Sequence, residues 1–218
     1  MEQITTSDYR QPKGWRHNAT WLYAVMLIAS ICAFMASLIL SADTLQLARH
    51  PDQQLGCDVN GAVSCSTVAQ SWQAEIIHFG GLSYPNAFFG IAAEAVFITV
   101  AVLGLSKVVF PRWFAWCTWA GNLCAFAYAY WLFSQSAFVI HALCPWCLVL
   151  MFTTTIQFIA QSHATVTVQG IPQSEGRFAS WQRALQTYYR LGADLLVDVL
   201  WIAVVVAIIL IKYGAAIL

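Results

Sequence analysis

Two cysteines separated by a proline and a tryptophan, Cys144 and Cys147, are the residues best suited to chemistry. They stand at the start of an apolar run that continues over residues 148–160. Residues three apart lie on one face of a helix, so these thiols could form a disulfide or exchange one. Pro145 suits the first turn of a helix, where the dipole and the free N–H groups favour a thiolate. The pattern predicts a redox-active pair at a helix N-terminus.

A second pair, Cys57 and Cys65, lies eight positions apart around the turn signal Asn60-Gly61. One interpretation is a shuttle, in which this loop pair takes electrons from an outside protein and passes them to Cys144 and Cys147. A second is a structural loop disulfide with an unrelated Cys-x-x-Cys motif. A third is a zinc site, but this spacing is not typical of zinc ligands, and we expect no metal.

The composition is that of an integral membrane protein. The chain has 218 residues, of which 60% are hydrophobic and 9% charged, against about 25% charged in soluble domains. Its ten basic and ten acidic residues give no net charge, so nucleic-acid binding has no electrostatic support. No cleavable signal peptide is evident, and we expect the first apolar run to act as an uncleaved anchor.

Five apolar runs are long enough, or nearly so, to cross a bilayer. The sequence therefore predicts an all-α membrane protein whose transmembrane helices cover residues 21–40, 86–105, 113–133, 141–160 and 195–211. The polar segments are an N-terminal segment, a long loop, a short turn and a second loop, over residues 1–20, 41–85, 107–112 and 161–194. Within the long loop, residues 66–77 are predicted to form a short amphipathic helix.

The basic residues predict the orientation. Eight of the ten fall in segments that five spans would place on one side, namely Arg10, Lys13, Arg16, Lys107, Arg112, Arg177, Arg183 and Arg190; Arg49 and Lys212 fall on the other. The positive-inside rule makes the first side cytoplasmic. The loop over residues 41–85, the Cys144 end of its helix and the C-terminus are then expected to face outward, in an oxidising compartment.

In these features the chain resembles the vitamin K epoxide reductase family, in its bacterial branch, over about residues 20–160. The resemblance rests on segments that match in order and spacing: Cys57-Asp58-Val59, Ser64-Cys65-Ser66, Ser71, residues 86–90 (NAFFG) and residues 144–147 (CPWC). Another quinone-linked thiol oxidase family has two cysteine pairs in the reverse order.

The resemblance implies a four-helix transmembrane bundle around a quinone of the menaquinone or ubiquinone type. It implies an enzyme of the bacterial inner membrane that oxidises a thioredoxin-like protein and reduces the quinone, supporting disulfide formation outside the cytoplasm. The roles it carries over are a shuttle pair, Cys57 and Cys65; a membrane pair, in which Cys144 meets the loop, preferably Cys65, and Cys147 faces the quinone; and two pocket residues, Asn86 and Ser71.

Two departures qualify this interpretation. Met151 stands where animal members carry a tyrosine near the bound ring, which argues against vitamin K epoxide as the substrate. Some bacterial members also have a fused thioredoxin-like domain, whereas this sequence ends at Leu218, so we expect a separate partner. A vitamin K epoxide or quinone reductase for quinone recycling, and a non-catalytic membrane protein with a structural disulfide, are the alternatives.

In domain terms we expect a redox bundle over residues 21–160 and a fifth helix over residues 195–218. Glu94 would lie inside the second span, where a carboxylate usually has a function. It could relay a proton to the quinone, or it could be a protonated, hydrogen-bonded bundle residue. The remaining cysteines, Cys32, Cys117 and Cys124, are expected to be packing residues.

Overall fold

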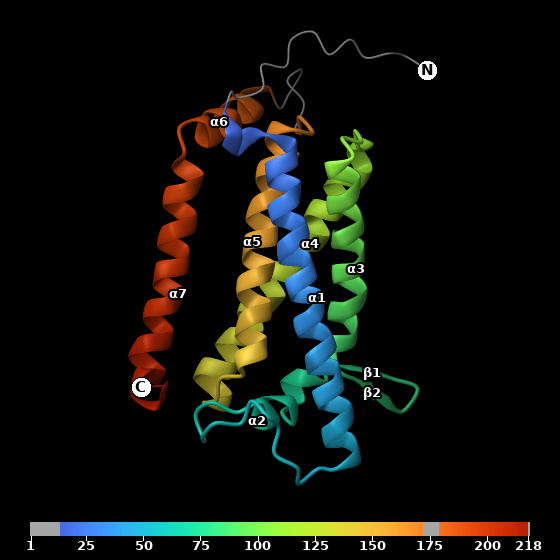
Figure 1. Cartoon of the computed structure of the whole chain (residues 1–218), viewed down its shortest axis with the longest axis vertical. Coiled ribbons are helices and arrows are strands. Elements are labelled where there is room, and N and C mark those ends of the chain that lie inside the picture. Colours follow the sequence, from blue (N-terminus) through green and yellow to red (C-terminus); the bar gives the residue numbers. More distant parts are fainter. Residues whose placement is uncertain (1–13, 172–178, 218) are drawn as a thin grey trace.

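The computed structural model describes residues 14–171 and 179–217, and long helices dominate it. Figure 1 shows these helices running roughly along one axis. They are α1 (Ala19–Arg49), α3 (Asn86–Leu105), α4 (Arg112–Gln135), α5 (Pro145–Thr167) and α7 (Ala193–Ile217). The predicted all-α membrane fold is confirmed. The parts of the predicted polar segments that fall on residues 1–13 and 172–178, and Leu218, lie outside the described residues.

Four of these helices are long and apolar enough to cross a membrane, by length and composition, among the described residues: α1, α3, α4 with the turn that follows it, and α7. The predicted fourth span corresponds to α5, which is not among them. Its inner face carries polar residues that are buried in the bundle, including Thr154, Gln157 and Gln161. These lower its hydropathy, although α5 packs along α1.

Helix α1 is longer than its predicted span of residues 21–40. Asn18 caps its N-terminus by accepting a hydrogen bond from the backbone N–H of Thr20 at 3.0 Å. No helix breaker occurs before Pro51, so the helix continues to Arg49. Its 31 residues span about 46 Å at 1.5 Å per residue, more than the ~30 Å hydrocarbon core. The last turns, with Asp43, therefore reach the loop that follows.

Helices α1 and α3 approach each other closely at two glycines of α3. A Cβ atom on Gly104 would come within 2.3 Å of the Tyr23 ring, and one on Gly90 within 2.6 Å of the Ser37 hydroxyl. Small residues of this kind let transmembrane helices pack closely. The contact is part of a core in which Met26, together with residues of α3, is fully buried.

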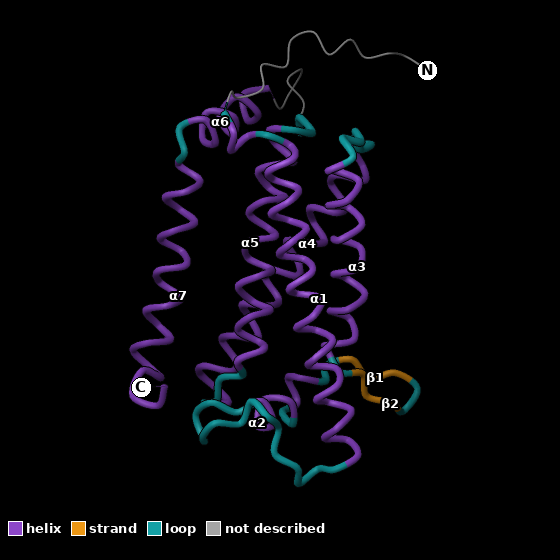
Figure 2. The backbone as a smooth tube through the Cα atoms, viewed as in Figure 1, coloured by secondary structure: helices purple, strands orange, loops and turns teal. Residues whose placement is uncertain are grey.

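The loop over residues 41–85 differs from the prediction. The expected helix over residues 66–77 is wrong: α2 (Cys65–Ala69), the 3-10 turn η2 (Trp72–Ala74) and a hairpin of β1 (Ile77–Phe79) and β2 (Leu82–Tyr84) are observed. Figure 2 shows this hairpin as the strand-forming part of the chain. Gly80 and Gly81 both have positive φ, 61° and 77°, as a two-residue type I′ turn requires, so the glycines favour a hairpin in which residues 77–79 form a strand.

The segment over residues 161–194 also contains helix where a polar loop was predicted. Helix α5 extends to Thr167, and the amphipathic α6 (Ala179–Arg190) lies across the end of the bundle that holds the turn η1 (Trp15–His17) (Figure 1). Arg16 and His163 both contact the Asp194 carboxylate, at 2.9 and 3.2 Å. These contacts, one of them the Arg16–Asp194 ion pair, fix the start of α7 to the bundle.

The other end of α7 is attached to the segment between α4 and α5. The Tyr213 hydroxyl donates a hydrogen bond to the carbonyl of Ala137 at 3.0 Å. Ala137 belongs to η3 (Ser136–Ile140), a π-helical turn that extends α4. His141 follows in the left-handed conformation, with φ of 59°, and the chain then turns into α5. The turn thus brings Cys144 to the start of α5.

Candidate functional site

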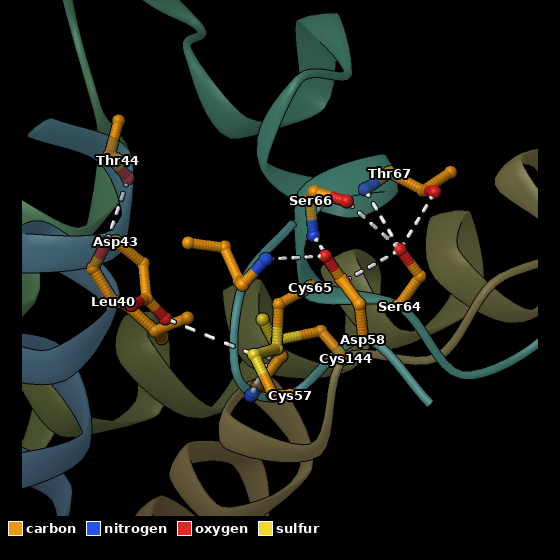
Figure 3. The surroundings of a disulfide bond; sticks show 12 residues. Leu40, Asp43, Thr44, Cys57, Asp58, Ser64, Cys65, Ser66, Thr67 and Cys144 are labelled. Carbon is orange, nitrogen blue, oxygen red and sulfur yellow. Dashed lines mark hydrogen bonds between the residues drawn. A yellow bond between two sulfur atoms is a disulfide. The ribbon is translucent and has the colours of Figure 1, made fainter. Parts of the chain in front are cut away.

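Cys57 and Cys65 form a disulfide with a Cα–Cα distance of 5.8 Å. Asp58, next to Cys57, folds the loop around it (Figure 3). Its carboxylate accepts hydrogen bonds from the backbone N–H groups of Leu55, at 2.8 Å, and Ser66, at 3.0 Å. Because these two residues flank the pair, Asp58 holds both ends of the loop.

The Ser64 hydroxyl adds two contacts to this arrangement. It donates to Asp58 at 2.9 Å and, as the N-cap of α2, accepts from the backbone N–H of Thr67 at 3.2 Å. Partial burial raises the pKa of Asp58, but the backbone N–H groups of Ser66 and Leu55 and the serine hydroxyls outweigh it and lower the pKa to about 2. Asp58 is therefore a charged anchor of the loop at any physiological pH.

A short backbone ladder attaches this loop to the start of α5. The N–H of Ser64 donates to the carbonyl of Leu143 at 3.0 Å, and the N–H of Leu143 donates to the carbonyl of Ala62 at 2.9 Å. Val63 and Leu143 thus form a parallel β-bridge. Since each is followed within two residues by a cysteine, the bridge brings Cys65 and Cys144 together.

Cys144 is the N-cap of α5, and Pro145 is the first residue of the helix, as predicted. The backbone N–H of Cys147 donates to the Cys144 sulfur at 3.3 Å, a contact that favours a thiolate there. The Cys144 Sγ lies 3.5 Å from the Cys65 Sγ, and both residues are buried. Cys144 and Cys147 are both free thiols. Because the Cys65 and Cys144 sulfur atoms are already this close, a disulfide exchange between the loop pair and the membrane pair needs little movement.

A cavity of about 540 Å³ opens beside these sulfur atoms, between α1, α3, α4 and α5. Most of its lining is apolar, and its size and character suit an aromatic ring with the start of a lipid tail. Five of the six predicted site residues line it, namely Cys65, Ser71, Asn86, Cys144 and Cys147. The sixth, Cys57, lies outside the lining and is joined to it through the disulfide.

Two polar side chains of the cavity already donate hydrogen bonds to backbone carbonyls of the protein. Asn86 donates through Nδ2 to the carbonyl of Gln73 at 2.6 Å and is also hydrogen-bonded to the Tyr128 hydroxyl, so the Asn86–Tyr128 pair keeps one hydrogen for a ligand. The Ser71 hydroxyl donates to the carbonyl of Val68 at 2.7 Å, so Ser71 can only accept from a ligand. The Asn86–Tyr128 pair therefore remains a candidate donor, and Ser71 does not.

Two further polar residues line the cavity, Tyr128 and the Glu94 that the sequence had singled out. Tyr128 lines it and has its hydroxyl hydrogen-bonded to Asn86; the sequence hid it among the many aromatic residues of α4. Glu94 also lines the cavity and is 3% exposed. It is hydrogen-bonded to Gln157, but its Oε2 has no partner among the described residues.

The remaining cysteines are not core residues. Cys32, Cys117 and Cys124 are all exposed on the helix surfaces, so the prediction that they are packing residues is wrong. In a membrane protein the outer face is as apolar as the core, and the sequence pattern does not separate the two. Cys124 additionally lines the cavity.

The model of the vitamin K epoxide reductase family matches residues 24–162. The matched region contains all six predicted site residues and ends within α5, so it leaves out α6 and α7. No curated protein matches the chain.

Proposed function

Because this chain belongs to the vitamin K epoxide reductase family, and is thus a multi-pass membrane oxidoreductase, we propose that it oxidises a thioredoxin-like protein and passes the electrons to a quinone. The acceptor is of the menaquinone or ubiquinone type, and the reaction supports disulfide formation outside the cytoplasm. The observation that carries this proposal is the 3.5 Å contact between Cys65 and Cys144 at the edge of an apolar cavity.

The loop pair receives the electrons. Cys57 is partly exposed, whereas Cys65 is 1% exposed, so a thiolate of the partner protein meets Cys57 first. Attack on the Cys57 sulfur releases Cys65 as a thiolate, and the partner's second thiol then releases Cys57. Cys65 is left facing Cys144.

The loop then reduces the membrane pair. The Cys65 thiolate attacks the Cys144 sulfur of a Cys144–Cys147 disulfide, which forms a Cys65–Cys144 mixed disulfide and releases the Cys147 thiolate. Cys57 attacks Cys65, closes the loop disulfide and releases Cys144. The covalent state of the structure, with Cys57–Cys65 joined and the membrane pair free, corresponds to the end of this exchange.

The cavity supplies the other half of the reaction. A bound quinone would accept two electrons and two protons. Cys147 lines the cavity and provides the thiolate that faces the ring, while the hydrogen-bonded pair of Asn86 and Tyr128 provides a donor for a carbonyl oxygen. Animal members of the family carry a tyrosine at the position of Met151 on α5. In this chain we assign the equivalent donor function to Tyr128, on α4. Glu94 is the acidic group placed to hold a proton in this cavity.

The test uses the purified protein, a reduced thioredoxin-like protein and a short-chain quinone followed by its absorbance. Wild-type protein should reduce the quinone only when the thiol donor is present, and Cys144→Ala or Cys147→Ala should reduce this rate to the uncatalysed level. Cys117→Ala, which alters an exposed thiol outside the cavity, is the matched control and should be fully active. Normal turnover in the Cys144→Ala, Cys147→Ala double variant would refute the assignment.

The same sample separates the proposal from its alternatives. A quinone-recycling enzyme would reduce quinone epoxide as fast as quinone, and a non-catalytic protein would reduce neither.

The outward orientation of both cysteine pairs stays a prediction. Labelling of introduced cysteines at Gly61 and near Arg190 from either side of the membrane measures it.

A further inference from the structure

Asp43 has no assigned function, although its carboxylate points toward the loop disulfide (Figure 3). It lies on the part of α1 that extends beyond the predicted span, and its Oδ2 is 4.0 Å from the Cys57 Sγ. A carboxylate oxygen of Asp43 and the sulfur atoms of Cys57 and Cys65 all lie within 4.8 Å of one another. Because the two sulfur atoms are joined in a disulfide, this cluster suits proton transfer between Asp43 and a cysteine better than it suits metal binding.

The two carboxylates near the pair differ in how they are used. Asp58 accepts three hydrogen bonds from the loop and thus holds its backbone in place. Asp43 accepts from no other donor among the described residues. A sulfur atom in a disulfide carries no proton, so its contact with Cys57 becomes a hydrogen bond only when Cys57 is a thiol. Asp43 is thus a free acceptor for that single state.

We propose that Asp43 is the general base that removes the proton of Cys57 when Cys57 resolves the Cys65–Cys144 mixed disulfide. This inference rests on the proposed function and adds a residue to it. In the step, the Cys57 sulfur forms a bond to the Cys65 sulfur, the Cys65–Cys144 bond breaks, and Cys144 leaves as a thiolate. The proton of Cys57 passes to the Asp43 carboxylate, which later releases it to water.

The step needs a base because a thiol is a poor nucleophile compared with its thiolate. A free thiolate on Cys57 would stand beside the negative Asp43, which disfavours it electrostatically. Direct transfer of the proton to Asp43 removes this conflict. It also discharges Asp43 at the moment when Cys144 becomes negative, so the charge moves from α1 to the N-terminus of α5, where the helix dipole stabilises it.

The experiment isolates this step from the quinone and from the partner protein. Both cysteine pairs are oxidised with diamide, the more exposed loop pair is reduced with a short pulse of a water-soluble phosphine, and samples are quenched with acid over time. Differential alkylation and mass spectrometry then give the fraction of Cys65–Cys144 mixed disulfide. In wild-type protein this species should appear only transiently.

The Asp43→Asn variant should accumulate the mixed disulfide and resolve it about 100-fold more slowly, as expected for loss of a general base. Asp43→Glu should restore part of the rate, and added formate should accelerate resolution in Asp43→Ala. Asp52→Asn, an exposed acidic position in the same loop, is the matched control and should resolve at the wild-type rate. Loss of a merely structural contact would not respond to formate.

Resolution at the wild-type rate in Asp43→Asn would overturn this inference and leave the proposed function intact. A wild-type protein that never forms the Cys65–Cys144 species would overturn the proposed electron path, and the function of Asp43 with it. Slow resolution that neither formate nor Asp43→Glu improves would assign Asp43 to loop structure and also overturn the inference.

Discussion

The Cys144 sulfur lies 3.5 Å from the Cys65 sulfur while it accepts a hydrogen bond from the backbone N–H of Cys147 at 3.3 Å. The contact between the two sulfur atoms predicts which mixed disulfide forms. In Cys57→Ser, the Cys65 thiolate can attack Cys144 but no thiol is left in the loop to resolve the product. The variant should therefore accumulate a Cys65–Cys144 disulfide, detected by mass spectrometry of peptides under non-reducing conditions.

The complementary variant is the control for this trap. Cys65→Ser should give no loop-to-membrane disulfide, because Cys57 lies outside the cavity lining and faces Asp43. Equal yields of trapped species in the two variants would show that either loop cysteine can reach Cys144, contrary to the geometry.

Tyr128 provides a second prediction, on quinone binding. Removing its hydroxyl in Tyr128→Phe deletes a donor worth about 1 kcal/mol, so KM for quinone should rise about 5-fold, while oxidation of the partner's thiols at saturating quinone stays near normal. Tyr130→Phe is the matched control: its hydroxyl is hydrogen-bonded to Thr155 at 3.0 Å and Tyr130 is not part of the cavity lining. An unchanged KM in Tyr128→Phe would exclude the tyrosine from the ring site.

The sequence predicted the helices well where a single pattern decides them. The apolar run over residues 86–105 became α3 with the same bounds, and the Cys-Pro-Trp-Cys motif begins α5. The prediction from sequence failed where backbone conformation or contacts with neighbouring segments determine the secondary structure. Gly80 and Gly81 impose a hairpin that hydrophobic periodicity does not reveal.

For the site as well, the sequence predicts the residues that carry the chemistry but not the contacts that the fold creates between them. The cysteine types and spacings predicted two redox pairs, because thiol chemistry needs those residues. The pairing of Cys65 with Cys144 depends on the bridge between Val63 and Leu143, which joins segments 80 positions apart and has no local signal. Tyr128 is likewise one aromatic residue among many until the fold directs it to the cavity.

A third prediction concerns Glu94 and proton delivery. Glu94 is a buried carboxylate of the cavity, and its Oε2 has no partner in the described part of the chain, so it is placed to supply a proton as the ring is reduced. Glu94→Gln should lower the rate of quinol formation about 10-fold or more, while exchange between the loop pair and the membrane pair remains normal. Glu75→Gln, outside the cavity, is the control. Quinol formation at the wild-type rate in Glu94→Gln would leave Glu94 as a hydrogen-bonded bundle residue.

The last prediction is the acid sensitivity of the cysteine loop. The pKa of Asp58 is lowered from 3.8 to about 2 in the folded loop, so the folded loop binds fewer protons than the unfolded one. The stabilisation of the folded loop by charged Asp58 is present above about pH 4 and is lost as the pH falls through about 2. Hydrogen exchange at Ser66, corrected for its intrinsic pH dependence, should lose protection over that interval.

Asp58→Asn should show the same loss of protection at neutral pH, by about 1 kcal/mol, because Asp58 is partly exposed and its hydrogen bonds are screened by solvent. The variant should also respond less to acid than wild type, since the titrating group is gone. Asp52→Asn, exposed in the same loop, should behave like wild type. Protection at Ser66 that persists in wild type at pH 2 and in Asp58→Asn at neutral pH would show that the loop is held by the disulfide and the Val63–Leu143 bridge alone.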